Sequence, residues 1–183
     1  MDGASADVSL PKGRRRLPLS AVAAGMVIGF AIAVAAILIV LFVFFRDSTP
    51  VLTETMFEEA VGRWQRRGPA SYNLDISVTG RQPGKIHVEV RDGAATSMTR
   101  DGVTPRQRRT WEYWTIPGQF ETIQQDWESA HDPEGGFGLP PGTKVSIRAA
   151  FDDELGFPAV YRRRVLGTPL IVEWEIDRFE IVP

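Results

Sequence analysis

The sequence contains no cysteine, and this absence excludes several kinds of site. Without Cys, the 183-residue chain forms no disulfide, thiolate metal site, Cys nucleophile or lipidated Cys. Only two His are present, and 21 Lys and Arg against 23 Asp and Glu give a formal net charge of −2. Because a charge this close to zero provides no electrostatic footprint for nucleic acid, we expect no nucleic-acid partner.

A long hydrophobic run near the N-terminus is the most informative feature that is present. Residues 21–45 include no charged or strongly polar side chain. As a helix, this run is about 38 Å long, enough to cross a hydrocarbon layer of about 30 Å. The sequence therefore predicts an N-terminal transmembrane helix, a signal anchor over residues 20–45, followed by a short linker over residues 46–54.

The charges around the run predict its orientation. Four basic residues precede it closely, and a single Arg follows it within the same distance, so residues 1–19 are expected in the cytoplasm. These four are Lys12, Arg14, Arg15 and Arg16. The alternative is a cleaved signal peptide ending at Ala33-Val34-Ala35. Cleavage there would leave the apolar residues 36–45 as a water-exposed N-terminus, so an uncleaved, single-pass anchor is favoured.

Small residues recur every four positions within the predicted span. They are Ala21, Gly25, Gly29 and Ala33. Such a stripe lets two membrane helices approach closely, which makes a homodimer through the transmembrane helix one candidate assembly. The alternative is a chance arrangement, because Gly and Ala are common in membrane helices.

The remaining residues, 55–183, alternate between helical and strand patterns. Thr55 and Glu58 match a capping box and predict a helix over residues 55–67. Helical spacing of apolar residues predicts a second helix over residues 118–130, and alternating apolar residues predict three strands before it and three after it. A change of register in the last strand predicts a β-bulge near Asp177-Arg178.

This order predicts an α+β domain with the sequence α-β-β-β-α-β-β-β. Half-buried strands favour a mostly antiparallel sheet of about six strands, with both helices on one face and water on the other. The segment Trp111-Glu112-Tyr113-Trp114, before the second helix, is expected to form a short strand or a packed loop.

Two short segments resemble a known family. They are RWQRRGPASYNLDI, from residue 63, and DDELGFPAVY, from residue 152. Together with the patterns between them, they resemble the bacterial extracytoplasmic family called domain of unknown function 6174, over about residues 55–180. The resemblance implies an exported bacterial protein and supplies no activity. Many members carry a Cys pair just after the first strand, whereas this chain has Val78-Thr79-Gly80 there, so no role for such thiols transfers.

Several polar groups are candidates for chemistry, and each has a plainer explanation. Asp152-Asp153-Glu154 lacks the ligand spacing of a Ca²⁺ loop and is expected to be a solvated turn. His131-Asp132 and His87-x-Glu89 could each pair a base with an orienting carboxylate, but no Ser or Thr lies in a nucleophile context nearby. The sequence therefore predicts no catalytic, cofactor-binding or metal-binding residues.

Charged and aromatic residues provide two further candidates. Arg162 and Arg164 are expected to pair across strands with the acidic set Glu173, Glu175 and Asp177. The alternative is an Arg face that binds anionic lipid or a polyanion. Trp111, Tyr113 and Trp114 could stack on sugars or peptides, although core packing is expected for at least two of them.

The sequence as a whole predicts an inner-membrane protein with its N-terminus in the cytoplasm and a binding domain outside it. Expected partners are the lipid bilayer, an envelope protein or a second copy of the chain. The alternative function is a membrane-tethered hydrolase that uses His131 or His87 with neighbouring carboxylates.

Overall fold

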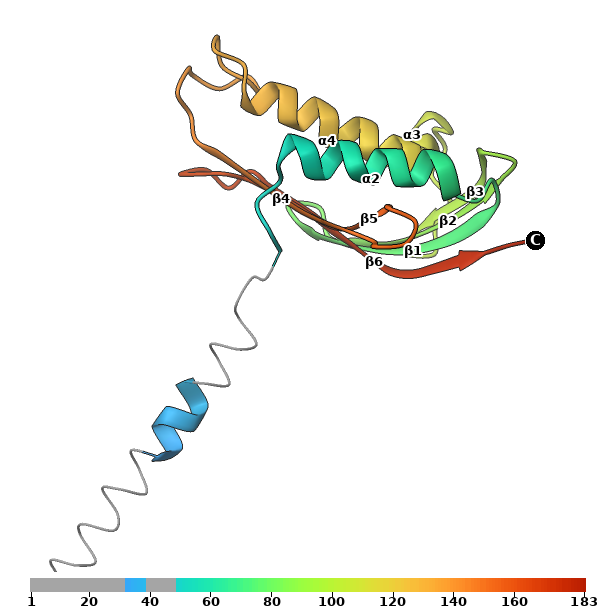
Figure 1. The fold of residues 1–183 in the computed structure, drawn as a ribbon, viewed down its shortest axis with the longest axis horizontal. Helices are drawn as coiled ribbons and strands as arrows, with labels where there is room; N and C mark the ends of the chain where they lie inside the picture. The colour runs from blue at the N-terminus through green and yellow to red at the C-terminus, as the bar shows by residue number, and fades with distance from the viewer. Residues whose placement is uncertain (1–31, 39–48) are drawn as a thin grey trace, which may run out of the picture. The chain divides into compact units, whose positions relative to one another are not determined.

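The computed structural model describes residues 32–38 and 49–183 (Figure 1). Residues 32–38, which include Ala33, are helical. Among the described residues, no helix is both long enough and apolar enough to cross a membrane. Most of the predicted anchor, 20–45, falls outside them, together with the basic and small residues assigned to topology and packing: Lys12, Arg14, Arg15, Arg16, Ala21, Gly25 and Gly29.

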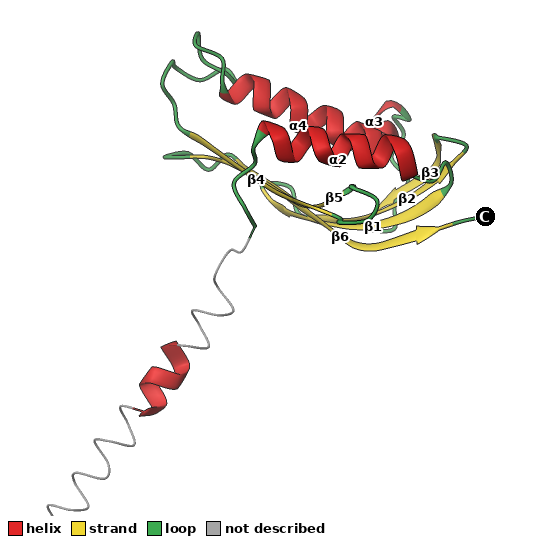
Figure 2. Cartoon of the chain, viewed as in Figure 1, coloured by secondary structure: helices red, strands yellow, loops and turns green. Residues whose placement is uncertain are grey.

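Residues Thr49–Pro183 form one compact unit in which helices cover one face of a sheet (Figures 1 and 2). The helices are α2 (Glu54–Arg67), α3 (Arg109–Glu112) and α4 (Ile116–Ala130). The strands are β1 (Tyr72–Gly80), β2 (Gly84–Arg91), β3 (Ala94–Arg100), β4 (Val145–Phe151), β5 (Pro158–Val165) and β6 (Ile171–Ile181). This confirms the predicted α+β class and six-stranded sheet.

The six strands lie in the order β3-β2-β1-β6-β5-β4, and every neighbouring pair is antiparallel. Each half of the chain forms a three-stranded meander, and the two halves join where β1 pairs with β6. In that pairing Asp75 lies opposite Arg178, while the next residue, Ile76, lies opposite Ile176. Asp177 is therefore the extra residue of a bulge, as predicted.

The start of α2 differs from the prediction. The N-cap is Thr53, whose hydroxyl accepts a hydrogen bond from the Met56 backbone N–H at 3.3 Å. The predicted capping box at Thr55 and Glu58 is wrong. Thr53 has the extended backbone that an N-cap needs (φ −123°, ψ 154°), whereas Thr55 already lies inside the helix.

The segment around Trp111 also differs from the prediction, because it forms the short helix α3 rather than a strand. Trp111 is buried, and the Ala95 backbone N–H of β3 donates to the Glu112 carboxylate at 3.3 Å. The segment packs against the edge of β3 and does not extend the sheet.

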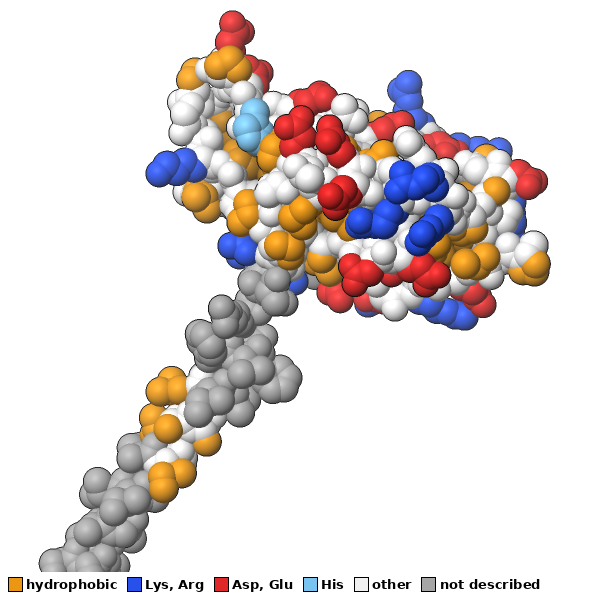
Figure 3. All heavy atoms as spheres, in the orientation of Figure 1, with side chains coloured by type: hydrophobic (Ala, Val, Ile, Leu, Met, Phe, Trp, Pro, Cys, Tyr) orange, Lys and Arg blue, Asp and Glu red, His pale blue; other side chains and the backbone are white. Residues whose placement is uncertain are grey.

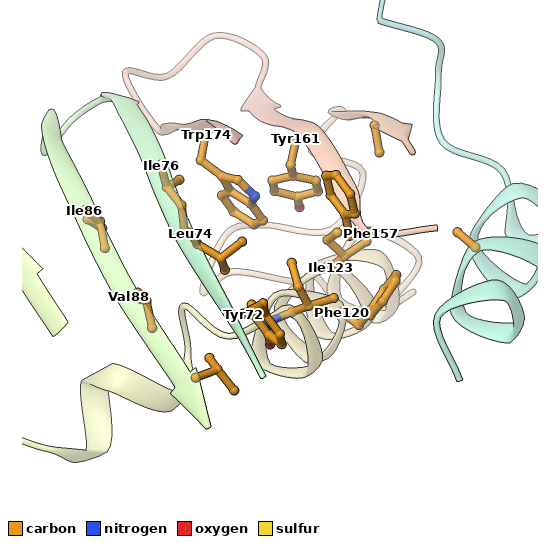
Figure 4. Packing of buried hydrophobic residues seen from close by; sticks show 14 of the residues in the cluster. Tyr72, Leu74, Ile76, Ile86, Val88, Phe120, Ile123, Phe157, Tyr161 and Trp174 are labelled. Atoms are coloured by element: carbon orange, nitrogen blue, oxygen red, sulfur yellow. The ribbon is translucent and has the colours of Figure 1, made fainter. Parts of the chain in front are cut away.

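The core lies between the helices and the inner face of the sheet (Figure 4). Alternate residues of the central strands point into it, among them Leu74, Ile76, Ile86 and Val88, and Ile123 of α4 meets them. Tyr72 ties β1 to α4, since its hydroxyl accepts a hydrogen bond from the Ile116 backbone N–H at 3.0 Å. Burial is the main cause that raises the pKa of Tyr72 to about 12.

Residues 49–52, within the predicted linker, lie along the outer edge of β4. The Leu52 N–H donates to the Ile147 carbonyl at 3.0 Å, and the Ala149 N–H donates to the Pro50 carbonyl at 3.2 Å. The Arg148 guanidinium also donates to the Thr49 carbonyl at 2.7 Å. The segment that leads into the domain is thus hydrogen-bonded to it from Thr49 onward.

Candidate functional site

The outer face of the sheet carries the first sequence candidate, His87. Its Nδ1 lies 2.7 Å from the Asp75 carboxylate on β1, and its Nε2 lies 3.7 Å from the Glu89 carboxylate. Glu89, the carboxylate considered as a partner for His87, is thus the more distant of the two, and the closer partner, Asp75, was not predicted. The imidazole is 40% exposed, and among the described residues no hydroxyl group hydrogen-bonds to it. This arrangement orients a surface His and supplies no nucleophile.

A second polar group on the same face surrounds the bulge residue Asp177. Its carboxylate accepts a hydrogen bond from the Ser77 hydroxyl at 2.5 Å and lies 2.9 Å from the Lys85 ammonium. Lys85 also donates to Ser77. The Ser77 hydrogen bond, followed by the Lys85 contact, lowers the pKa of Asp177 below its usual range. At the bulge, the Asp177 carboxylate therefore contacts Ser77 on β1 and Lys85 on β2.

The predicted cross-strand charge pairing is confirmed for Arg164. Its guanidinium donates to one Glu173 carboxylate oxygen from Nε at 2.8 Å and from Nη2 at 2.6 Å. Arg162 lies opposite Glu173 in the register of β5 and β6. The basic and acidic residues of this face therefore alternate with one another, which does not favour a purely cationic lipid-binding surface.

Arg163 points to the opposite face and belongs to a buried polar cluster that the sequence did not reveal. The carboxylate of Asp126 on α4 accepts a hydrogen bond from the Tyr161 hydroxyl at 2.6 Å and pairs with the Arg163 guanidinium at 2.5 Å. The guanidinium also lies over the Phe137 ring, 4.5 Å from its centroid. Burial, reinforced by the Asp126 charge, raises the pKa of Tyr161 far above its ordinary value. Tyr161 is therefore a fixed hydrogen-bond donor.

His131 lies at the end of α4, away from His87. Its Nδ1 is 2.8 Å from the Trp127 carbonyl, and its ring lies 4.2 Å from the Trp127 ring. Asp132, the predicted orienting carboxylate, instead accepts a hydrogen bond from the Glu134 backbone N–H at 2.9 Å. The loop after α4 encloses a hollow of about 260 Å³ that His131 lines. The structure does not bring the two His together.

The turn at Asp152-Asp153-Glu154 is built by its own carboxylate. Asp152 accepts hydrogen bonds from the backbone N–H groups of Glu154 at 3.0 Å and Leu155 at 2.7 Å. This fits the predicted turn, in which Asp153 and Glu154 are exposed. Among the described residues, no cluster of three or more His, Asp and Glu is arranged to hold a metal ion.

The three aromatic residues near α3 divide between core and surface. Trp111 is buried, and Trp114 packs edge-on against Trp174 with ring centroids 6.2 Å apart. Tyr113 is 52% exposed. Core packing of two of the three is confirmed, and one ring alone does not make a stacking platform.

The outer surface of the helical layer carries a groove that the sequence analysis missed. It lies between α2 and α4, holds about 350 Å³ and has aromatic side chains from both helices, Phe57 and Trp127. Three carboxylates and one amide complete its lining: Glu54, Glu58, Glu128 and Gln124. No periodicity signals this site, because it depends on how two helices that are distant in the sequence pack together.

The charges of the groove are open to a partner. Gln124 donates to Glu128 at 2.9 Å, but among the described residues neither Glu54 nor Glu58 pairs with a cation. Figure 3 shows acidic side chains gathered toward one end of the helical layer and basic side chains beside them along α2. Aromatic rings next to carboxylates suit a cationic side chain, through cation–π and ion-pair contacts.

Gly62, in the middle of α2, has its own helix as its nearest neighbour. The three side-chain atoms nearest to a Cβ at this position would all belong to Arg66, whose Nη1 would lie 3.1 Å away. A Gly inside a helix costs about 1 kcal/mol relative to Ala. No described element requires this notch, so the fold alone does not explain it.

The comparisons with known proteins identify a family and no activity. The chain belongs to the family described as Family of unknown function (DUF6174), whose model matches residues 56–160, more than half of the chain. This confirms the resemblance drawn from its short segments. No curated protein and no solved structure matches the chain.

Proposed function

We propose that this chain is a single-pass bacterial inner-membrane protein whose α+β domain binds a protein partner outside the cytoplasm. The anchoring part of the proposal rests on the sequence, in which residues 21–45 are uniformly apolar and follow a basic cluster. The binding part rests on one observation, the groove between α2 and α4, in which the partly exposed rings of Phe57 and Trp127 lie beside carboxylates. Two of these carboxylates, Glu54 and Glu58, pair with no cation among the described residues.

The attachment of residues 49–52 to β4 supports a short tether. Thr49 is held by Arg148, and in the sequence three residues, 46–48, lie between the apolar run and Thr49. Four residue steps, from 45 to 49, span at most about 14 Å. The proposed binding domain therefore works close to the lipid surface, and its partner is a membrane or envelope protein.

Photocrosslinking at neighbouring glutamines tests the binding role. Gln124 lines the groove, whereas Gln125 is equally exposed on α4 and lies outside it. We expect a photoreactive residue at position 124, in the full chain in cells, to give a discrete protein adduct that Glu58→Arg removes. The same residue at position 125 is the matched control. Equal adducts at both positions, insensitive to Glu58→Arg, would contradict the proposal.

One observation favours a second candidate, the hydrolase that uses His87. The 2.7 Å contact between His87 and Asp75 is the geometry of a base held by an orienting carboxylate. If the domain is instead a binder, the double variant His87→Ala, His131→Ala keeps both its thermal stability and its crosslink at position 124. The readout is complementation of a strain that lacks the protein. A double variant that keeps the crosslink but no longer complements this strain would favour the hydrolase.

A further inference from the structure

We propose that the groove receives a second copy of this chain, packed antiparallel along α2 about a two-fold axis at Gly62. This inference rests on the proposed binding function and names its partner. It is carried by three observations on α2: the order of its charges, the notch at Gly62, and the aromatic groove beside its acidic end.

The charges of α2 are self-complementary about Gly62. Glu58, Gly62 and Arg66 follow one another at intervals of four, so they share one stripe of the helix surface. Glu58 and Arg66 are exposed and lie equally far from Gly62 in opposite directions. A two-fold axis across the helix at Gly62 therefore places Glu58 of each copy opposite Arg66 of the other.

The notch lets the two helices approach. Gly62 lies on the axis itself, where the helix surfaces are closest, and a missing Cβ on both copies brings the backbones together. The Arg66 side chain reaches over this notch in the single chain, with Nη1 3.1 Å from where a Cβ would be. The Arg66 side chain is long and exposed, and among the described residues it forms no ion pair that would hold it there.

The groove supplies the site for that guanidinium. Glu58 lines the groove together with Phe57 and Trp127. The two-fold rotation that places Arg66 of one copy opposite Glu58 of the other therefore also places this Arg66 near the two aromatic rings. A guanidinium over an indole ring and between carboxylates gains both cation–π and ionic contacts. Two such groove contacts form in each dimer, because the interface is the same on both copies.

The order of charges along α2 has a second, simpler origin, since acidic residues suit the start of a helix and basic residues suit its end. That effect explains neither the Gly at the centre nor the aromatic groove beside Glu58. A foreign cationic segment would fill the groove but would have no need of the notch. A second copy uses all three features, and anchoring two copies in one membrane raises their effective concentration.

Disulfide trapping in membranes tests this arrangement with the full chain. The chain has no Cys, so Gly62→Cys introduces a single thiol at the axis. Glu175→Cys, on the exposed outer face of the sheet, is the control for random collision. We expect mild oxidation to give a linked dimer through position 62 and little through position 175.

Charge reversal in the Gly62→Cys background identifies the contact. Glu58→Arg and Arg66→Glu should each reduce the linked dimer about tenfold, because both exposed pairs become repulsive. The double reversal restores opposite charges at both contacts, and should return the yield to within about twofold of the starting value. Glu121→Arg, an equal charge change on α4 outside the groove, should leave the yield unchanged.

The outcomes separate this inference from the proposed function. A linked dimer that is absent, or insensitive to the single reversals, overturns the second copy as the occupant. Failure of the double reversal to restore the dimer also overturns it, even if each single reversal abolishes the dimer. In all three cases an adduct to a different protein at position 124 would leave the binding function standing. Circular dichroism of each variant confirms that the domain stays folded.

Discussion

At the residue scale, the least expected feature is a charged pair placed between the helices and the sheet. Asp126 is 8% exposed and is shared by Tyr161 and Arg163, which both come from β5. Through these two contacts the Asp126 carboxylate joins α4 to β5, in a layer that apolar side chains usually fill. Buried pairs contribute little net stability, but breaking one leaves the remaining charge without compensation.

Removing Asp126 should therefore destabilise the domain strongly. We expect Asp126→Ala to lower the free energy of unfolding by about 3 kcal/mol, because the largely buried Arg163 loses its ion pair. Tyr161→Phe removes one hydrogen bond and leaves the ion pair, so it should cost about 1 kcal/mol. Urea unfolding followed by Trp fluorescence measures both. Equal, small effects would show that the cluster does not hold α4 to the sheet.

Asp177 should make a small contribution to stability that depends on pH. Its pKa is lowered in the folded state by Ser77 and Lys85, so the contribution is present above the usual carboxyl pKa and is lost as the pH falls through the folded value. Because the group is largely exposed, solvent screening limits the contribution to about 0.5 kcal/mol.

We expect Asp177→Asn to lower the unfolding free energy slightly at pH 7 and to approach the parent chain as the pH falls below the lowered pKa of Asp177, where both are uncharged at this site. Glu175→Gln, on the same strand, is the control. If the difference in unfolding free energy between the parent chain and Asp177→Asn grew as the pH fell, the pKa of Asp177 would be raised by folding and not lowered. High salt should reduce the difference at pH 7.

At the scale of elements, the turn between β4 and β5 fixes where α2 lies. Gly156 has φ +85°, and a Cβ there would collide with the Ala60 carbonyl oxygen and the Arg63 side chain of α2. The segment DDELGFP thus combines a turn closed by Asp152 with a Gly that allows close contact to the helix. This gives a physical reason for one of the segments that resemble the family.

Replacing Gly156 tests that contact against a matched position. Gly167 has a similar φ of +80°, but nothing lies within 4 Å of its Cβ position. We expect Gly167→Ala to cost about 1 kcal/mol, from backbone strain alone, and Gly156→Ala to cost about 3 kcal/mol, from strain plus displacement of α2. Thermal unfolding of both variants measures the difference. Equal costs would mean that α2 does not depend on this turn.

Local patterns predicted the elements well, because alternation and helical spacing are recorded in neighbouring residues. The bulge at Asp177 was also predictable, since it shifts the apolar set of β6 by one position. The cap of α2 was misplaced from Thr53 to Thr55, because both are Thr and the prediction relied on Glu58. The segment at Trp111 was misassigned because aromatic residues suit strands, whereas α3 forms to cover Trp111.

The candidate site was much less predictable than the elements. Contacts such as Asp75 with His87 require the strand register, and Asp126 with Arg163 requires the packing of α4 on β5. The groove requires two helices to lie side by side, which brings Phe57 next to Trp127. None of these distances is encoded in a local sequence pattern.

At the scale of the whole molecule, the chain covers the β4 edge of the sheet and contacts the β3 edge at two points. Residues 49–52 pair with the edge of β4, while Glu112 accepts from Ala95 on the edge of β3. Near the end of β3, Arg100 exchanges backbone hydrogen bonds with Val103. A covered edge disfavours association by strand addition, and this applies to β4. We assign partner binding to the helical face because it carries the groove between α2 and α4.

Thiol labelling in spheroplasts is the sharpest test of the proposal that this domain lies outside the cytoplasm. The natural absence of Cys makes single-Cys variants of the full chain unambiguous. We expect a membrane-impermeant maleimide to label Glu175→Cys in intact spheroplasts and to label Ser5→Cys only after lysis. Labelling of Ser5→Cys in intact spheroplasts, with Glu175→Cys protected until lysis, would contradict it.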